Sequence, residues 1–95
     1  MKIVELECDD QYEAEKLSSL MSVQKDGSVW VSGVEAMVTN EIVIQLKDRS
    51  SHAVLLKDEP TVARLGLLID DLLRGKIKIQ STTYIGSTTK ITTMD

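Results

Sequence analysis

Apolar and polar positions follow two different periods along the chain, and each period predicts a type of element. Near the start, Val4, Leu6 and Cys8 alternate with glutamates, which is typical of a strand with one buried face. From Ala14 the apolar residues recur every three or four positions, which predicts an amphipathic helix that ends near Val23. The first part of the chain is therefore predicted to be a strand followed by a helix.

Polar side chains around the start of this helix suit its first turn. Asp9 or Asp10 can serve as the N-cap, and Asp10 with Glu13 approximates a capping box. Because Glu13 and Lys16 are three residues apart, we expect them to form an ion pair on the outer face of the helix.

The second helix has clear signals at both ends. Pro60 suits the first helical position, because the N–H group that proline lacks would have no partner there. The apolar stripe from Thr61 to Arg74 is followed by Gly75, which suits the left-handed residue just past a helix end. Alternation from Lys76 to Ile79 then predicts a strand. The buried arc of this helix is expected to contain Val62, Leu65, Leu68, Ile69, Leu72 and Leu73.

The segment between the two helices begins with an irregular strand in this interpretation. Asp26 and Gly27 mark a turn, after which Val29 and Val31 point one way and Trp30 points the other. The next glycine, Gly33, indicates a bulge or a bend.

A β-hairpin is predicted to follow. Val34 to Asn40 alternates like a strand but would also suit a helical turn, and we favour irregular or extended structure. Glu41 to Lys47 alternates strongly and predicts a strand. The polar run from Asp48 to Ser51 indicates the hairpin loop, and His52 to Lys57 the returning strand.

The C-terminal segment, Ser81 to Asp95, is dominated by serine and threonine. Threonine favours strands, but this segment offers few apolar side chains for a core face. Gly86 and Ser87 can turn a hairpin. We therefore expect a hairpin at the edge of a sheet, whose last few residues fray.

These elements predict one small α+β domain over residues 1–95, without an internal repeat or a linker. We expect a single mixed β-sheet of five to seven strands with the two helices packed on one face. The first strand–helix–strand unit is expected to cross over with a right hand.

Length and composition are consistent with a core that needs no covalent support. Ninety-five residues suffice for such a core, and the lone Cys8 cannot form an internal disulfide. We find no signal peptide and no apolar run near the roughly 20 residues that cross a bilayer, so we expect a soluble, cytoplasmic protein without a membrane partner. Phenylalanine is absent, which predicts an aliphatic core and weighs against a nucleotide or cofactor pocket.

The formal net charge is −4, and acidic residues gather between Glu5 and Glu15. An acidic protein repels phosphate at long range, which weighs against binding of nucleic acid. The same charge favours a basic protein partner.

No pattern indicates catalysis, a metal site or a cofactor. The only histidine, His52, is predicted on the surface, and Cys8 on a core face as an inert thiol. One histidine and one cysteine weigh against a zinc site, and the acids between Glu5 and Glu15 are accounted for as helix caps and a solvated face. No glycine opens a helix as a phosphate loop would. We therefore expect no enzyme activity, no metal and no cofactor.

Two groups of residues suggest contact with other molecules. Leu67 falls opposite the buried arc of its helix, and Trp30, Met37 and Tyr84 are further apolar or aromatic candidates, so these four are assigned to a partner-binding surface. The basic residues form a second group that could contact phosphate, although such lysines also keep strands soluble. This group contains Arg74, Lys76 and Lys78.

The sequence thus favours a non-enzymatic accessory or regulatory protein that acts by protein–protein interaction. We expect it to self-associate as a homodimer, through a strand edge or the sheet face that carries Trp30. The alternatives are a small-ligand (nucleotide or metabolite) binding module and weak nucleic-acid contact through Lys76 and Lys78.

Overall fold

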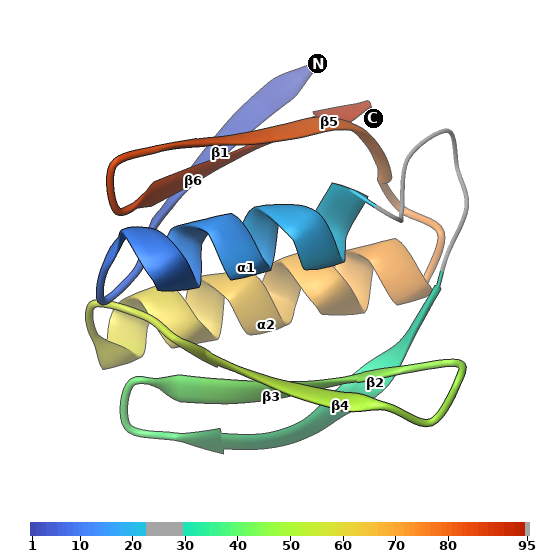
Figure 1. The fold of residues 1–95 in the computed structure, drawn as a ribbon. Helices are drawn as coiled ribbons and strands as arrows, with labels where there is room; N and C mark the ends of the chain where they lie inside the picture. The colour runs from blue at the N-terminus through green and yellow to red at the C-terminus, as the bar shows by residue number, and fades with distance from the viewer. Residues whose placement is uncertain (23–29, 95) are drawn as a thin grey trace.

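Two three-stranded antiparallel sheets enclose a layer that contains both helices (Figure 1). The structure is a computed structural model that describes residues 1–22 and 30–94. One sheet has the strand order β1-β6-β5 and the other has the order β2-β3-β4. The elements are β1 (Lys2–Glu7), α1 (Gln11–Ser22), β2 (Val31–Val38), β3 (Glu41–Leu46), β4 (Ser51–Leu55), α2 (Glu59–Leu73), β5 (Lys78–Ile85) and β6 (Thr88–Met94).

The expected single mixed sheet with helices on one face is therefore wrong. All strand pairs are antiparallel, and β1 and β2 belong to different sheets, so the expected right-handed crossover does not form. Alternation along a strand shows which face is buried, but it does not show which strand lies beside it. The partner of β1 is β6, where Leu6 lies opposite Thr89 from the far end of the chain.

The predicted bounds of α2 are confirmed to within two residues. Asp58 is the N-cap and Pro60 is the second helical residue. At the other end Arg74 is the C-cap, and Gly75 has a φ of +74°, the left-handed conformation that glycine adopts without a Cβ clash. The arc prediction fails only at Leu73, which is partly exposed.

Helix α1 also starts where the sequence predicts, but one of its side chains points elsewhere. The carboxylate of Asp10 accepts a hydrogen bond from the amide of Glu13 at 2.9 Å. Glu13 and Lys16 form the expected ion pair at 3.1 Å. However, Glu13 is only 6% exposed, so the prediction that it lies on the outer face is wrong. Val23, the expected end, lies outside the described residues.

The hairpin predictions hold in the part of the chain that the structure describes. Strands β3 and β4 are joined by the predicted loop, and Gly33 coincides with a register shift between β2 and β3. Val34 to Asn40, which the sequence left ambiguous, is the second half of β2 and its turn. The predicted turn at Asp26 and Gly27, together with Val29, lies outside the described residues.

The C-terminal hairpin is not an edge element. Strand β6 is the central strand of its sheet, between β1 and β5, and it continues to Met94. Its inner face contains Thr89 and Thr93, which are both buried. The hydroxyl of Thr89 donates to the carbonyl of Ala14 at 2.9 Å, and that of Thr93 to the carbonyl of Lys2 at 3.4 Å. A threonine can therefore occupy a core position here because a carbonyl accepts its hydroxyl proton.

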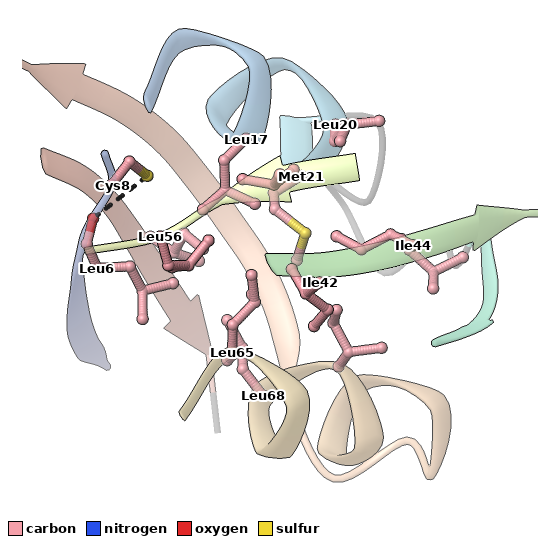
Figure 2. Packing of buried hydrophobic residues seen from close by; sticks show 14 of the residues in the cluster. Leu6, Cys8, Leu17, Leu20, Met21, Ile42, Ile44, Leu56, Leu65 and Leu68 are labelled. Atoms are coloured by element: carbon pink, nitrogen blue, oxygen red, sulfur yellow. Dashed lines mark hydrogen bonds between the residues drawn. The ribbon is translucent and has the colours of Figure 1, made fainter. Parts of the chain in front are cut away.

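The core is aliphatic, as the composition predicts, and it lies between the sheets. Figure 2 shows side chains from both helices and from β1 and β3 converging in one cluster. Leu17 and Met21 of α1 and Leu65 of α2 are fully buried in it.

An isolated antiparallel bridge between Cys8 and Leu56 joins the two sheets. Next to it, the amide of Asp9 donates to the carbonyl of Leu55, and the amide of Lys57 to the carbonyl of Glu7, both at 3.0 Å. Both helices begin within three residues of this bridge, so they start at the same end of the molecule (Figure 1).

Helix side chains close the two strand edges that flank the bridge. On β4, the amide of Leu55 donates to Glu13 at 2.8 Å, and Lys16 donates to the carbonyl of Ala53 at 2.8 Å. On β1, Arg64 of α2 donates to the carbonyl of Glu5 at 2.9 Å. An edge whose backbone groups are already paired cannot accept another strand at those positions.

The fold consists of two copies of one βαββ unit, so the expectation of no internal repeat is wrong. The first unit contains β1, α1, β2 and β3, and the second contains β4, α2, β5 and β6. In each sheet the first strand of one unit pairs with the hairpin of the other. Lys16 and Arg64 are 48 positions apart, and so are the residues whose carbonyls they bond, Glu5 and Ala53. Buried helix residues that correspond at this spacing are Leu17 and Leu65, Leu20 and Leu68, and Met21 and Ile69.

Each residue of the β2–β3 hairpin turn corresponds to the residue 47 positions later, in the turn of the β5–β6 hairpin. The amide of Leu56 donates to the carbonyl of Asn40, and the amide of Cys8 donates to that of Ser87, both at 2.7 Å. The two units therefore repeat the same backbone contacts around the bridge. This equivalence allows each surface of one unit to be compared with its counterpart in the other.

The N-cap of α2 should make part of the stability depend on pH. Asp58 accepts hydrogen bonds from the amide and the hydroxyl of Thr61, which lower the pKa of Asp58. Because the pKa of the folded state lies below the unfolded value of about 3.9, the stabilisation is present above about pH 4 and is lost as the pH falls through the folded value. We expect Asp58→Asn, which keeps the cap, to remove this part of the acid sensitivity. In urea denaturation, the free energy of unfolding of Asp58→Asn should lie below that of the wild type, by less at about pH 3 than at about pH 6. A difference that is the same at both pH values would show that Asp58 is not the source of this pH dependence.

Candidate functional site

An apolar groove of about 500 Å³ lies between α2 and β2, and it brings together two residues that the sequence analysis singled out separately. Met37 contributes from β2 and Leu67 from α2. Although both line the groove, Met37 is 55% exposed and Leu67 is 66% exposed. The remaining lining of this α2–β2 groove is mainly Val34, Ala63, Gly66 and Leu73, with Asp70 at its rim.

Local structure explains why the groove is open. Val34 and Met37 are on the inner face of β2, opposite the buried Ile44 and Ile42 of β3. Beyond β2 no described strand continues the sheet. Inward-facing side chains at this edge are therefore covered on one side only, by α2.

Gly66 leaves room on α2 for the side chain of Met37. A Cβ atom at this position would lie 3.2 Å from Sδ of Met37, which is closer than ordinary contact. The sequence analysis did not single out Gly66, although glycine inside a helix costs about 1 kcal/mol relative to alanine and often marks a close approach. A glycine in the middle of the predicted helix was therefore the feature of the sequence that could have indicated this close contact.

The other two predicted partner-binding residues lie elsewhere. Trp30 precedes β2 and is half-exposed. Tyr84 is on β5, in the other sheet, where it is partly buried against the core. The structure therefore unites Met37 and Leu67 and separates both from Trp30 and Tyr84.

Of the three basic residues singled out in the sequence, Lys76 and Lys78 line one hollow, together with Met94. Arg74 is paired with Asp70 at 3.0 Å. Lys76 lies in the turn before β5 rather than on the predicted strand, and only Lys78 is part of that strand. Tyr84, which could have stacked on a base, packs against the core instead.

A second cleft of about 380 Å³ lies between α1 and the β3–β4 hairpin. Its lysine already has partners: Lys16 is bonded to Glu13 and Ala53 and lies 5.2 Å from the ring centroid of Tyr12. A cation with this many neighbours has little capacity left for an anionic ligand. The cleft is lined by Tyr12, Glu15, Lys16, Ser19, Leu20, Leu46 and His52.

His52 belongs to a hydrogen-bonded group within the hairpin. Its Nε2 lies 2.9 Å from the hydroxyl of Ser50, which donates to Asp48 at 2.5 Å. The hydrogen bonds from Ser50 lower the pKa of Asp48. In a serine hydrolase the acid orients the imidazole, whereas here the acid accepts from the hydroxyl itself. An arrangement in which the carboxylate binds the hydroxyl does not activate the hydroxyl as a nucleophile. These three side chains are therefore explained by their role in the structure of the hairpin loop.

Cys8 lies apart from His52. The thiol is buried, with Leu6 carbonyl at 3.8 Å and the hydroxyl of Thr89 at 3.7 Å, and burial raises the pKa of the Cys8 thiol. Its bridge partner, Leu56, is four residues from His52, which corresponds to roughly 13 Å along an extended chain. A thiol with a raised pKa is a poor nucleophile at neutral pH.

Within residues 1–22 and 30–94, no three histidine, cysteine or acidic side chains lie close enough together to hold a metal ion. In the same ranges no helix has both the length and the apolar character needed to cross a membrane.

Comparison of the chain with protein-family models, curated proteins and solved structures finds no match.

Replacing Gly66 tests how rigid the groove is. The atom that a new Cβ would meet belongs to the flexible end of Met37, which can move by a few tenths of an ångström. Because alanine favours a helix interior, we expect Gly66→Ala to raise the free energy of unfolding by up to about 1 kcal/mol in urea denaturation. A decrease would show that Met37 cannot move and that the wall of the groove is rigid.

Proposed function

We propose that this protein is a non-enzymatic interaction module that binds a partner protein through the α2–β2 groove. The observation that carries the proposal is the meeting of Met37 and Leu67, both exposed, in one apolar groove. Single exposed apolar residues are common on protein surfaces, whereas residues from two separate elements that line one groove suit a docking site.

The chemistry of the groove supports binding rather than reaction. Its walls are apolar, and its only ionisable lining residue, Asp70, is paired with Arg74. A catalytic site needs a nucleophile or a base that another group orients, and neither lines the groove. A regulatory or accessory role, in a cytoplasmic setting, agrees with this mode of action.

Replacing Leu67 tests the proposal. Leu67→Asp places a charge in the apolar groove and should weaken partner binding at least tenfold, because the carboxylate would lose water on docking. The side chain is exposed, so the melting temperature should change little. Ser19→Asp is the matched control, since Ser19 is also exposed and lies at the corresponding position of α1.

The measurement is affinity purification from host lysate with wild-type, Leu67→Asp and Ser19→Asp baits, followed by quantitative mass spectrometry. A protein recovered with the wild type and Ser19→Asp, but lost with Leu67→Asp, would support the proposal. Recovery of the same proteins at the same level with all three baits would refute it.

Self-association is a second candidate, favoured by the outer face of β2-β3-β4. A row of small uncharged side chains crosses this face, so two copies could pack along the row without burying a charge. The row consists of Ala36, Val43 and Ala53, and the corresponding row of the other sheet consists of Thr83, Lys90 and Glu5.

A charge in the middle of this row should prevent the dimer. We expect wild-type protein to have about twice the chain mass of 10.5 kDa in light scattering and Val43→Lys to have the chain mass. Lysine is tolerated at the corresponding position of the other sheet, so the variant should fold. Thr83→Lys, on the other outer face, is the control and should remain dimeric. A wild-type monomer would rule this association out.

A further inference from the structure

We propose that Met37 makes the α2–β2 groove sensitive to oxidation: a peroxide converts its thioether to the sulfoxide, which ends partner binding, and reduction restores it. This inference rests on the proposed function, because it takes the groove as the docking site. It follows from the exposure of Met37, from the place of its sulfur on the wall of the groove, and from the apolar character of the side chains around it.

Met37 is the methionine whose oxidation would change this surface. The sequence has four methionines, which are Met1, Met21, Met37 and Met94. Met21 is fully buried in the core, so an oxidant in water does not reach its sulfur. Met1 and Met94 are exposed, but neither lines the groove. Met37 lines it and is 55% exposed, so it combines access to an oxidant with a place in the candidate site.

The sulfur of Met37 lies on the helix side of the groove. Its Sδ is 3.2 Å, and its Cε 3.8 Å, from the point where a Cβ of residue 66 would be, and glycine leaves that point empty. The end of the Met37 side chain therefore reaches across the groove to α2. Because the sulfoxide oxygen is bonded directly to Sδ, it would also lie at the groove.

The reaction adds one oxygen atom to the sulfur. A lone pair on Sδ forms a bond to one oxygen of hydrogen peroxide, the O–O bond breaks, and the other oxygen takes up the proton of the first and leaves as water. The sulfur is oxidised and the peroxide is reduced. Two thiols reverse the step through a methionine sulfoxide reductase: the oxygen leaves as water, and the thiols become a disulfide.

The new oxygen would find no hydrogen-bond donor among the side chains that line the groove. Those around Met37 are apolar or, at Gly66, absent, and the carboxylate of Asp70 is an acceptor. Water would therefore solvate the sulfoxide, and a partner with an apolar surface would have to remove that water in order to dock. Oxidation should thus weaken binding for the same reason as Leu67→Asp.

The second unit has no equivalent of this thioether. Met37 lies opposite the buried Ile42 in the β2–β3 hairpin, and Tyr84 lies opposite the buried Thr89 in the β5–β6 hairpin. Tyr84 packs against the core and contains no sulfur. Of these two corresponding places, only the one in the candidate binding surface can therefore form a sulfoxide.

Peptide mapping by mass spectrometry tests whether peroxide reaches Met37 in the folded protein. Wild-type protein and Met37→Leu are treated with hydrogen peroxide, and leucine is chosen because it keeps the volume but not the sulfur. We expect the sulfoxide to form at least tenfold faster at Met37 than at Met21, with little change in melting temperature, because an exposed sulfoxide remains solvated. Equal rates at the two residues would overturn the inference. So would a melting temperature that falls as Met37 of the wild type is oxidised but not in treated Met37→Leu, since oxidation would then act on the fold.

Affinity purification with oxidised baits then tests the effect on binding. The proteins to follow are those that wild-type bait recovers and Leu67→Asp loses. Oxidised wild type should recover them at least tenfold less than untreated wild type, and treatment with methionine sulfoxide reductases and dithiothreitol should restore them. Oxidised Met37→Leu should recover them as untreated Met37→Leu does.

The outcomes separate the two proposals. Undiminished recovery by oxidised wild type, while Leu67→Asp still loses the same proteins, would refute the inference and leave the proposed function in place. Equal loss with oxidised wild type and oxidised Met37→Leu would assign the effect to Met1, Met94 or another residue, and would also refute the inference alone. If Leu67→Asp loses no protein, the proposed function is refuted, and the inference with it.

Discussion

The antiparallel bridge between Cys8 and Leu56 is the contact on which the arrangement of the molecule depends. It joins the first strands of the two βαββ units and thereby holds one sheet above the other. Since each helix begins just after its first strand, the bridge also brings both helix starts to one end of the middle layer (Figure 1). The two apolar sheet faces are then covered by the same pair of helices. A buried thiol suits this position because it packs as a small apolar group.

Closure of the strand edges explains where the free surface arises. The edges next to the bridge are covered by Lys16 and Glu13 of α1 and by Arg64 of α2, which bond directly to strand backbone. Strands β2 and β5 lie at the opposite edges, where no described strand follows. At β5 the contact between Ser18 and Thr82 joins helix to strand. At β2 an apolar groove separates the edge strand from α2, and the candidate site lies in this groove.

The duplicated unit provides an internal comparison. Both copies have the same strand order and the same backbone contacts around the bridge. They differ in backbone at the groove, because β2 has a register shift between Val34 and Ala36 that β5 lacks. They also differ in side chains: Met37 corresponds to Tyr84, and Gly66 to Ser18. On the outer faces, an uncharged row in one sheet corresponds to a polar row in the other. Function is thus argued from the site and not from the fold that carries it.

The amino-acid sequence by itself determined the local structure, because caps, turns and periodicity act over a few residues. Asp58 and Gly75 bound α2, and Leu67 stands out as an apolar residue opposite the buried arc of its helix. Only the tertiary structure decided which strands pair, that Thr89 is a core residue, and that Met37 and Leu67 share a groove. Those outcomes depend on burying every apolar face and pairing every buried polar group at once, a condition on the whole chain that no short segment contains.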